Sequence, residues 1–323
     1  MHGRPLAPGY STFGDNIISL KILNEEGKIE ILSRNNKLFY KIIGGLSLFG
    51  IVLEAKIKLS KLEKINYHLK HFQISSSKNF KKFDSKNSIF YGYLNFFSKS
   101  KLEGNFMTIT QNKDINEFKE KRKSDFFFKT INFFKIDIFL SYFINNFTLR
   151  FFYYLLFKYS KNLLLNKQEL LNHERNVYFV NINTYLPYYF RKGMIEIQFS
   201  IPKKNIINII NHIKSLQFKF NVFPYFFILK KMDSSNSKYI FNFPKYNHCI
   251  SLGFSKQAYL KNKVFFKYLY NLIYKNRGNI YITKDETFLH NNPKKKFINF
   301  CKNVLNINST ISSNFKEKLF KIN

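Results

Sequence analysis

Two lysines lie where apolar strands end, and a lysine in that setting can take part in chemistry. Lys230 falls near the end of FPYFFILKK, and Lys284 falls near the end of NIYITKD. An ammonium group withdrawn from water can stabilise negative charge or polarise a hydroxyl group. The alternative is a lysine that covers the surface with its alkyl chain and keeps its charge in water, which is common in a chain with 46 lysines.

Polar residues in two further strands extend this candidate site. Gln198 lies mid-strand in GMIEIQFSIP, opposite an apolar face, so its amide could bind a hydroxyl group; a solvent-facing glutamine is the alternative. Cys249 follows His248, a combination that suggests a nucleophile and its base. Neighbouring strand residues point to opposite faces, so we expect Cys249 to line a pocket without pairing with His248. The His and Cys spacings predict no metal site.

The formal net charge of +33 raises the question of nucleic-acid binding. Only seven of the 53 basic residues are Arg, and the lysines are spread along the chain. We therefore expect a lysine-coated surface and no nucleic-acid partner, although the charge still favours an anionic substrate or membrane surface. The first residues show no signal segment, so the sequence predicts a cytoplasmic protein or one peripheral at the inner membrane.

The aromatic segment 126–161 is the best candidate for membrane contact. Its longest stretch without charge has 12 residues, fewer than the about 20 that a transmembrane helix needs. We expect it to form core or a lid, or else a patch at a membrane interface that meets a lipid-linked substrate.

Hydrophobic periodicity predicts the elements that must position these residues. The N-terminal part predicts a hairpin over 16–32, a short helix, a glycine turn at Gly44, Gly45 and Gly50, and an alternating strand over 51–59. The C-terminal part predicts the order strand, helix, strand, strand, helix, strand from 194 to 285. That order is typical of an antiparallel sheet with both helices on one face.

Several motifs, in order along the chain, resemble those of one flavoprotein family. HG is followed by FGDNIISLKILNEEGKIEIL and LFYKIIGGLSLFGIVLEAKIKL, and later by IEIQFSIP, FFILKKMD, FNFPKYNHCISLGF and NIYITKDE. The series is similar to that of FAD-linked oxidases of the vanillyl-alcohol oxidase superfamily, and most similar to the decaprenylphosphoryl-β-D-ribose 2′-oxidase branch. The resemblance implies an α+β fold. Its parts would be the C-terminal part of a PCMH-type FAD-binding domain (1–62), a substrate domain (63–278) with an aromatic insertion (126–161), and a C-terminal segment (279–323) returning to the FAD domain.

The resemblance also implies a role for each residue that falls on a family motif. The implied FAD contacts are His2, Gly3, Gly44, Gly45, Gly50, Val52 and Tyr281. The implied catalytic residues are Lys284, Lys230 and Gln198, and the implied residues of the substrate pocket are Cys249 and Glu196.

The sequence departs from the family at the cofactor-binding half. It shows no counterpart of the glycine-rich loop that grips the FAD diphosphate, and the family's GLTG and PGW appear as SLFG and PKY. Two expectations follow. The chain would be an FAD-dependent oxidoreductase that acts on a secondary hydroxyl of a sugar or polyol, such as a polyprenyl-phosphate pentose, and that needs a separate N-terminal FAD-binding chain. Alternatively, it would be a non-catalytic remnant or partner subunit.

Overall fold

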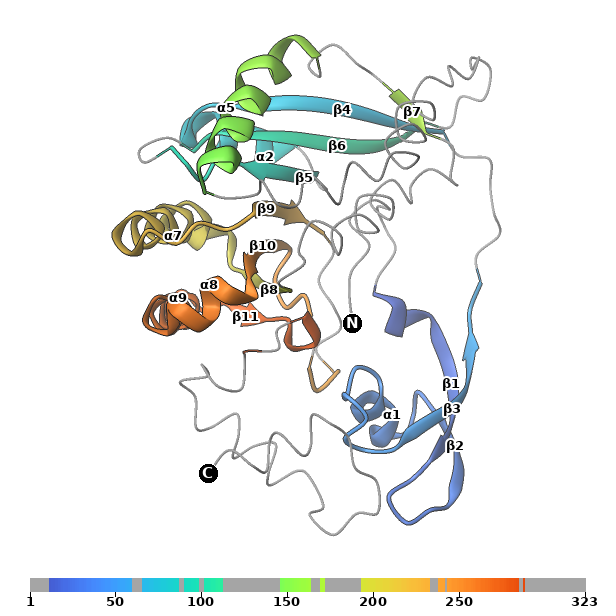
Figure 1. Ribbon diagram of the computed structural model, residues 1–323. Helices are drawn as coiled ribbons and strands as arrows, with labels where there is room; N and C mark the ends of the chain where they lie inside the picture. The colour runs from blue at the N-terminus through green and yellow to red at the C-terminus, as the bar shows by residue number, and fades with distance from the viewer. Residues whose placement is uncertain are drawn as a thin grey trace, which may run out of the picture.

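The computed structural model describes residues 12–59, 66–86, 90–98, 102–112, 146–163, 169–171, 193–232, 238–241, 243–284 and 287. These residues form two antiparallel sheets with helices packed against them, so the predicted α+β class is confirmed (Figure 1). The smaller sheet comes from the N-terminal part of the chain, and the larger sheet comes from the remainder.

The small sheet has three strands in the order β2-β1-β3. A 3-10 turn, Phe13–Asn16, leads into β1 (Ile17–Leu23), which pairs with β2 (Ile29–Ser33) as the predicted hairpin. The short helix α1 (Lys37–Ile42) follows, and β3 (Ile51–Ile57) returns to pair with β1. The buried side chains of Leu20, Ile22 and Leu32 form one core with Phe39 and Ile42 of α1.

The glycine turn between α1 and β3 is explained by packing within this unit. Gly44 has a φ of 73° just after α1, as expected of a residue that ends a helix in the left-handed conformation. A Cβ on Gly45 would lie 2.0 Å from the carbonyl oxygen of Lys41, and one on Gly50 would lie 2.9 Å from that of Leu23. The backbone thus approaches α1 and β1 at positions where a side chain would clash.

The large sheet has eight strands, and every pair is antiparallel. The order is β11 (Asn279–Ile280), β8 (Met194–Ile201), β10 (His248–Ser255), β9 (Phe226–Lys231), β5 (Phe90–Leu94), β6 (Gly104–Asn112), β4 (Asn66–Ile74) and β7 (Glu169–Leu171). The four C-terminal strands predicted from the sequence therefore share one sheet, as expected. The last of them is shorter than predicted, because after Ile280 the chain turns into a 3-10 helix, Ile282–Lys284.

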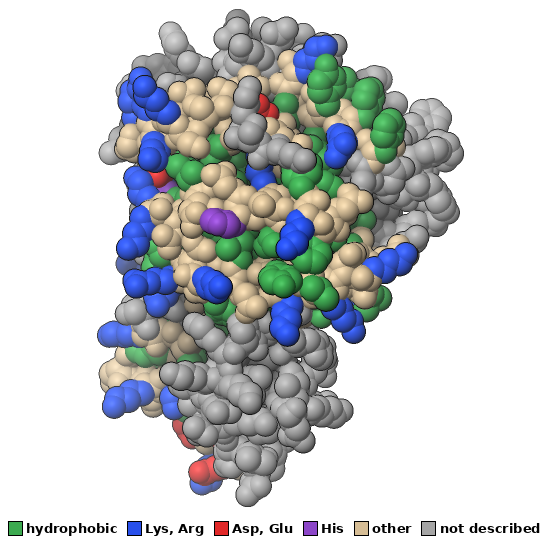
Figure 2. Space-filling model, turned by 90° about the vertical axis from the view of Figure 1, so that its left-hand side faces the viewer, with side chains coloured by type: hydrophobic (Ala, Val, Ile, Leu, Met, Phe, Trp, Pro, Cys, Tyr) green, Lys and Arg blue, Asp and Glu red, His purple; other side chains and the backbone are tan. Residues whose placement is uncertain are grey.

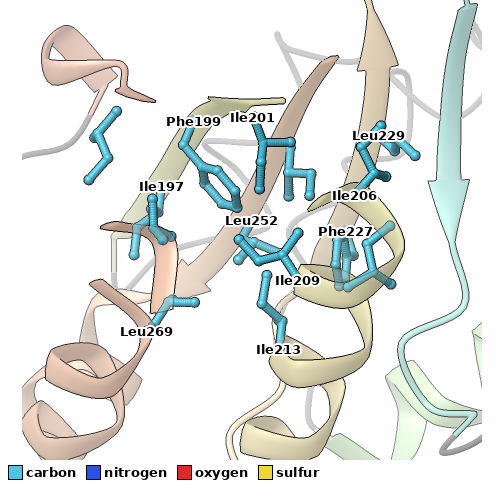
Figure 3. Close-up of a cluster of buried hydrophobic side chains, with 14 of the residues drawn as sticks. Ile197, Phe199, Ile201, Ile206, Ile209, Ile213, Phe227, Leu229, Leu252 and Leu269 are labelled. Atoms are coloured by element: carbon cyan, nitrogen blue, oxygen red, sulfur yellow. The ribbon is translucent and has the colours of Figure 1, made fainter. Parts of the chain in front are cut away.

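The two helices predicted between the C-terminal strands lie on one face of this part of the sheet, as expected. After a 3-10 turn (Lys203–Asn205), α7 (Ile206–Phe220) packs beside α9 (Lys263–Lys275) over the apolar face of β8, β10 and β9 (Figures 1 and 3). The helix predicted from Ala258, with Gly278 just past its end, is divided at Asn262 into α8 (Lys256–Lys261) and α9. The buried side chains meeting there include Ile197, Phe199, Leu252, Phe227, Ile209, Ile213 and Leu269.

Two further helices pack on opposite faces of the β5-β6-β4 part of the sheet. Helix α2 (Ser77–Lys86) lies on the same face as α7, where rings of Phe80 and Phe83 contact Phe90 and Phe106 at centroid distances of 5.2–6.0 Å. Helix α5 (Asn146–Leu163) lies against the other face, where the carbonyl oxygen of Phe157 accepts a hydrogen bond from the amide of Gln73. None of the described helices is long and apolar enough to cross a membrane.

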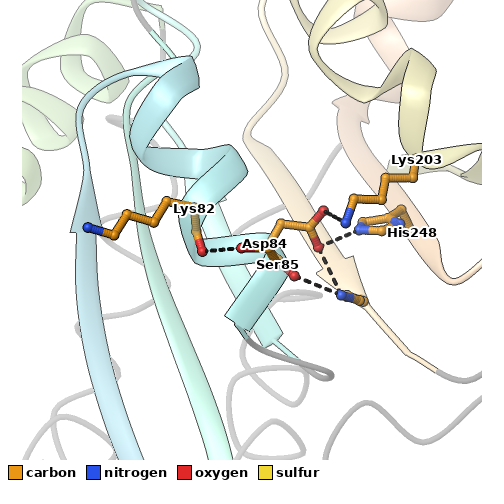
Figure 4. Close-up of polar contacts among 6 residues, drawn as sticks. Lys82, Asp84, Ser85, Lys203 and His248 are labelled. Atoms are coloured by element: carbon orange, nitrogen blue, oxygen red, sulfur yellow. Dashed lines mark hydrogen bonds and ion pairs between the residues drawn. The ribbon is translucent and has the colours of Figure 1, made fainter.

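A buried carboxylate joins α2 to the strands beside it. The Asp84 carboxylate lies 2.8 Å from His248 Nε2 and accepts from Nζ of Lys231 at 3.0 Å and of Lys203 at 3.1 Å (Figure 4). Burial alone would raise the pKa of the Asp84 carboxyl, but His248 and the two lysines outweigh it and hold the pKa well below its ordinary value. The network therefore fastens α2 to β9 and β10.

Asp84→Ala should lower the free energy of unfolding by about 3 kcal/mol, because it leaves buried donors without their carboxylate. Urea unfolding measures this, with Glu54→Ala as the control. Glu54 pairs with Lys21 at the surface, and its loss should cost less than about 1 kcal/mol. The Asp84 contribution should fade as the pH falls below about 4, since a carboxyl with a depressed folded-state pKa stabilises only above its unfolded pKa. Equal effects of the two substitutions would contradict this role.

Candidate functional site

The face of the large sheet opposite α7 and α9 carries the predicted catalytic and substrate-pocket residues. Lys230 of β9, Cys249 of β10 and Ser200 of β8 lie in one cross-strand row, because Cys249 is in register with both of the others. The adjacent row places Ser251 beside Gln198, and the next places Gly253 beside Glu196. Residues two apart along a strand share a face, so all these side chains stand on the same side of the sheet.

An ion pair between Lys284 and Glu196 lies over this face. After β11, the 3-10 turn at Ile282–Lys284 brings Lys284 back over β8, where its Nζ lies 3.1 Å from both carboxylate oxygens of Glu196. Ser251 donates to the same carboxylate at 2.9 Å. The side chains of Lys284 and Glu196 are 36% and 19% exposed, so this pair forms the solvent-facing part of the set.

Lys230 lies deeper, with 6% of its surface exposed. Burial and, to a lesser extent, the charge of Lys284 lower the pKa of the Lys230 amine to about 8, while Cys249 and Glu196 act in the opposite direction. A lysine in this state exchanges its proton near neutral pH, which an exposed lysine does not do. The sequence prediction of a desolvated lysine is therefore matched at Lys230, whereas Lys284 remains partly in water.

Cys249 is enclosed by apolar side chains. It belongs to a buried cluster with Met232 and Phe243, against which Tyr281 packs, and the rings of Phe243 and Tyr281 stack with centroids 4.5 Å apart. Burial raises the pKa of the Cys249 thiol to about 12, although the charge of Lys230 opposes the shift, so the thiol is protonated and unreactive at neutral pH. His248 points to the helix face, where it contacts Asp84, so the expectation that it does not pair with Cys249 is confirmed.

The predicted contacts from the N-terminal part lie elsewhere. Gly44, Gly45, Gly50 and Val52 belong to the small sheet and its turn, and Val52 is 48% exposed. Tyr239 links the two sheets, because its hydroxyl donates to Asp15 at 2.8 Å and its ring contacts Tyr40. His2, Gly3 and residues 126–145 of the aromatic segment lie outside the described part of the chain.

Sequence reasoning missed two members of this face. Tyr91 of β5 is in register with Lys230, it is buried, and desolvation raises the pKa of its phenol well above the ordinary value. Ser251 orients Glu196 through the hydrogen bond already described. The signal for both was present, since Tyr91 and Tyr93 alternate in IFYGYL and Ser251 alternates with Ile250 and Leu252, but only pairing with β9 and β8 reveals the shared face.

The assembled set contains the kinds of group that bind and polarise small polar molecules. It combines a buried amine, a buried amide from Gln198, a partly exposed carboxylate and a phenol within largely apolar walls. Convergent polar groups of this kind fix the orientation of small molecules in enzymes and binding proteins. Among the described residues, no group of three or more His, Cys, Asp or Glu side chains is placed to hold a metal ion.

Compared with models of known protein families and with curated protein sequences, the chain matches none.

Replacing Lys230 should remove the free-energy cost of burying its amine, which depends on pH because the amine must lose its proton or be buried with its charge. Because the folded-state pKa is about 8 and the ordinary value is 10.5, the folded protein binds fewer protons between these pH values, and its stability should rise across that range. Lys230→Met should therefore be more stable than the wild type below pH 8, by up to about 3 kcal/mol, and lose this advantage by about pH 10.5. Urea unfolding across this pH range measures the difference, and Lys219→Met, at an exposed position, is the control. If the free energy of unfolding depended on pH in the same way for Lys230→Met and wild type, the lowered pKa of Lys230 would be contradicted.

Proposed function

We propose that the chain is part of a flavin-dependent oxidoreductase that oxidises a secondary hydroxyl group of a sugar or polyol. The observation that carries the proposal is the buried Lys230, with its lowered pKa, on the same sheet face as Glu196, Gln198 and Lys284. The order of the sequence motifs is the ground for proposing a flavin cofactor. The side chains on the sheet face are of the kinds that bind an alcohol. A lipid-linked sugar such as a polyprenyl-phosphate pentose is one member of this substrate class.

Each residue of the face has a role in this chemistry. A bound flavin would accept the hydride from the carbon that bears the hydroxyl. Lys230 would exchange the hydroxyl proton near neutral pH, because its pKa is about 8. Glu196, held by Lys284 and Ser251, would accept a hydrogen bond from a neighbouring hydroxyl of the substrate. The Gln198 amide can orient a hydroxyl or the polar edge of the flavin ring.

The described residues fit the flavin ring better than they fit the FAD diphosphate. The polar edge of a flavin ring accepts hydrogen bonds, and the amines of Lys230 and Lys284 are donors on one sheet face. A diphosphate is usually held by successive backbone N–H groups of a glycine-rich loop. In the turn at Gly44, Gly45 and Gly50, the backbone is instead packed against α1 and β1. Cys249 is enclosed in a cluster with Phe243 and Tyr281, so a flavin ring could reach it only after these two side chains move.

The small sheet favours a complementing polypeptide segment. All seven residues of β3 are exposed, including Ile51 at 43%, Val52 at 48% and Leu53 at 46%, and no described strand pairs with its outer edge. Register places Ile29, Leu23 and Ile51 in one row across the sheet, and Ile29 is 62% exposed. An apolar face beside an open strand edge is a typical pairing surface.

The same surface supports the second candidate function, a non-catalytic partner subunit of a flavoprotein. In both cases a segment that carries the diphosphate loop would pair with β3. The domain boundaries at 62 and 278 and a cytoplasmic or peripheral location remain predictions alongside this one.

The chain alone should bind FAD weakly or not at all, whereas coexpression with a segment carrying a glycine-rich FAD loop should give a yellow complex. Absorbance of the purified protein and its stoichiometry of flavin release measure this. Ile51→Lys combined with Leu53→Lys should prevent complex formation, because the charges would lie in the paired sheet. Val264→Lys, at an exposed position of α9, is the control and should leave complex formation unchanged. Stoichiometric FAD on the chain alone would contradict the need for a complementing segment.

In the flavin-bound complex, Lys284→Ala should slow flavin reduction by substrate at least about tenfold, since it releases Glu196 from its ion pair. Stopped-flow absorbance measures the rate, and unfolding by urea should change by less than about 1 kcal/mol because the pair is partly exposed. Lys275→Ala, an exposed lysine of α9, is the matched control. Flavin loading without any reduction by alcohols would instead favour the non-catalytic partner subunit.

A further inference from the structure

Six large apolar side chains are exposed on three helices of the larger unit. On α5 they recur on one helical face, and on α8 and α9 they recur at intervals of four residues. Their exposed fractions range from 50% to 79%. We call these residues the helix band: Phe147, Phe151, Tyr154, Leu260, Val264 and Tyr268.

Contacts among aromatic rings and a guanidinium group connect the two halves of the band through the C-terminal end of α7. The guanidinium of Arg150 on α5 lies 5.9 Å from the ring centroid of Phe223, which follows α7 and packs against Phe218. Phe220 of α7 then contacts the ring of Tyr268 at a centroid distance of 5.6 Å. Helices α5, α7 and α9 lie at the same side of the molecule, and these contacts connect them (Figure 1).

This side of the molecule is strongly basic. Helices α5, α7, α8 and α9 contain no Asp or Glu residue. Exposed basic residues flank the band, among them Arg150, Lys158, Lys263 and Lys267, and Lys219 Nζ lies 6.0 Å from the ring centroid of Tyr268. Figure 2 shows Lys and Arg side chains spread among hydrophobic ones on this side.

The combination of residue types distinguishes between two anionic partners. A single-stranded nucleic acid is bound by aromatic platforms together with basic groups, and Leu260 and Val264 would add nothing to stacking on bases. A bilayer interface takes up aliphatic and aromatic side chains alike, with lysines reaching the phosphates around them. The exposed aliphatic residues within a lysine-rich surface therefore favour a lipid partner.

We propose that the helix band docks the protein on the surface of an anionic membrane. The apolar side chains enter the boundary between headgroups and acyl chains, while Lys and Arg contact anionic headgroups. The contact is peripheral, because none of the described helices can span a bilayer. It requires neither flavin nor substrate, so its failure would leave the proposed chemistry untouched.

Cosedimentation of the full chain with lipid vesicles tests the proposal. Vesicles of phosphatidylcholine and phosphatidylglycerol in equal parts should bind the protein at least about tenfold more tightly than phosphatidylcholine alone, and added salt should weaken binding. Joint substitution Leu260→Ser, Val264→Ser and Tyr268→Ser should weaken binding about tenfold, and so should Phe147→Ser, Phe151→Ser and Tyr154→Ser.

The matched control is Phe13→Ser with Leu59→Ser, which removes exposed apolar side chains that lie outside the helix band and outside the proposed pairing surface. It should bind vesicles like the wild type, and all variants should unfold at unchanged urea concentration because the substituted residues are exposed. Equal binding to neutral and anionic vesicles, or equal loss in the control, would overturn the proposal. Displacement of the protein from vesicles by single-stranded RNA at stoichiometric amounts would also overturn it, in favour of a nucleic-acid surface.

Discussion

The pairing of β8, β10 and β9 in one antiparallel register is the constraint on which the rest of the structure depends. It places the odd-numbered residues of β8 and the even-numbered residues of β10 on a single apolar face, which α7 and α9 cover. The same pairing gathers Lys230, Cys249 and Gln198 on the opposite face. A shift of one residue would exchange the faces and bury the polar set under the helices.

Two clusters of polar side chains lie on opposite faces of this sheet. On the helix face, Asp84 accepts from His248, Lys231 and Lys203 and ties α2 to the strands. On the other face, Glu196 pairs with Lys284 and accepts from Ser251, while Lys230 remains without a carboxylate in direct contact among the described ion pairs. The first arrangement satisfies its charges and serves stability. The second holds a desolvated amine, which is the kind of group that chemistry uses.

Much of the fold could be predicted from periodicity. The N-terminal hairpin and the strand–helix order from 194 to 280 follow from the hydrophobic period of two residues in strands and 3.6 residues in helices. The helix-ending role of Gly44 follows from the left-handed conformation that glycine accepts. Three features could not be predicted in this way. The break at Asn262 is local, since the side-chain amide of Asn262 donates to the carbonyl oxygen of Ala258. The early end of β11 and the joining of β5, β6, β4 and β7 to the same sheet depend on contacts between segments distant in the sequence. The roles of Tyr91 and Ser251 were missed for the same reason.

The sequence by itself determined which residues alternate and therefore which side chains of one strand share a face. It also placed His248 and Cys249 on opposite faces, because adjacent residues of any strand diverge. Only the tertiary structure decided which strands are neighbours, and hence that Lys230 lies beside Cys249 while Lys284 returns to Glu196. It also decided how far each lysine is buried, since desolvation depends on all surrounding segments. Proton affinity follows from that burial, so the chemical character of Lys230 belongs to the fold and not to its place in FPYFFILKK.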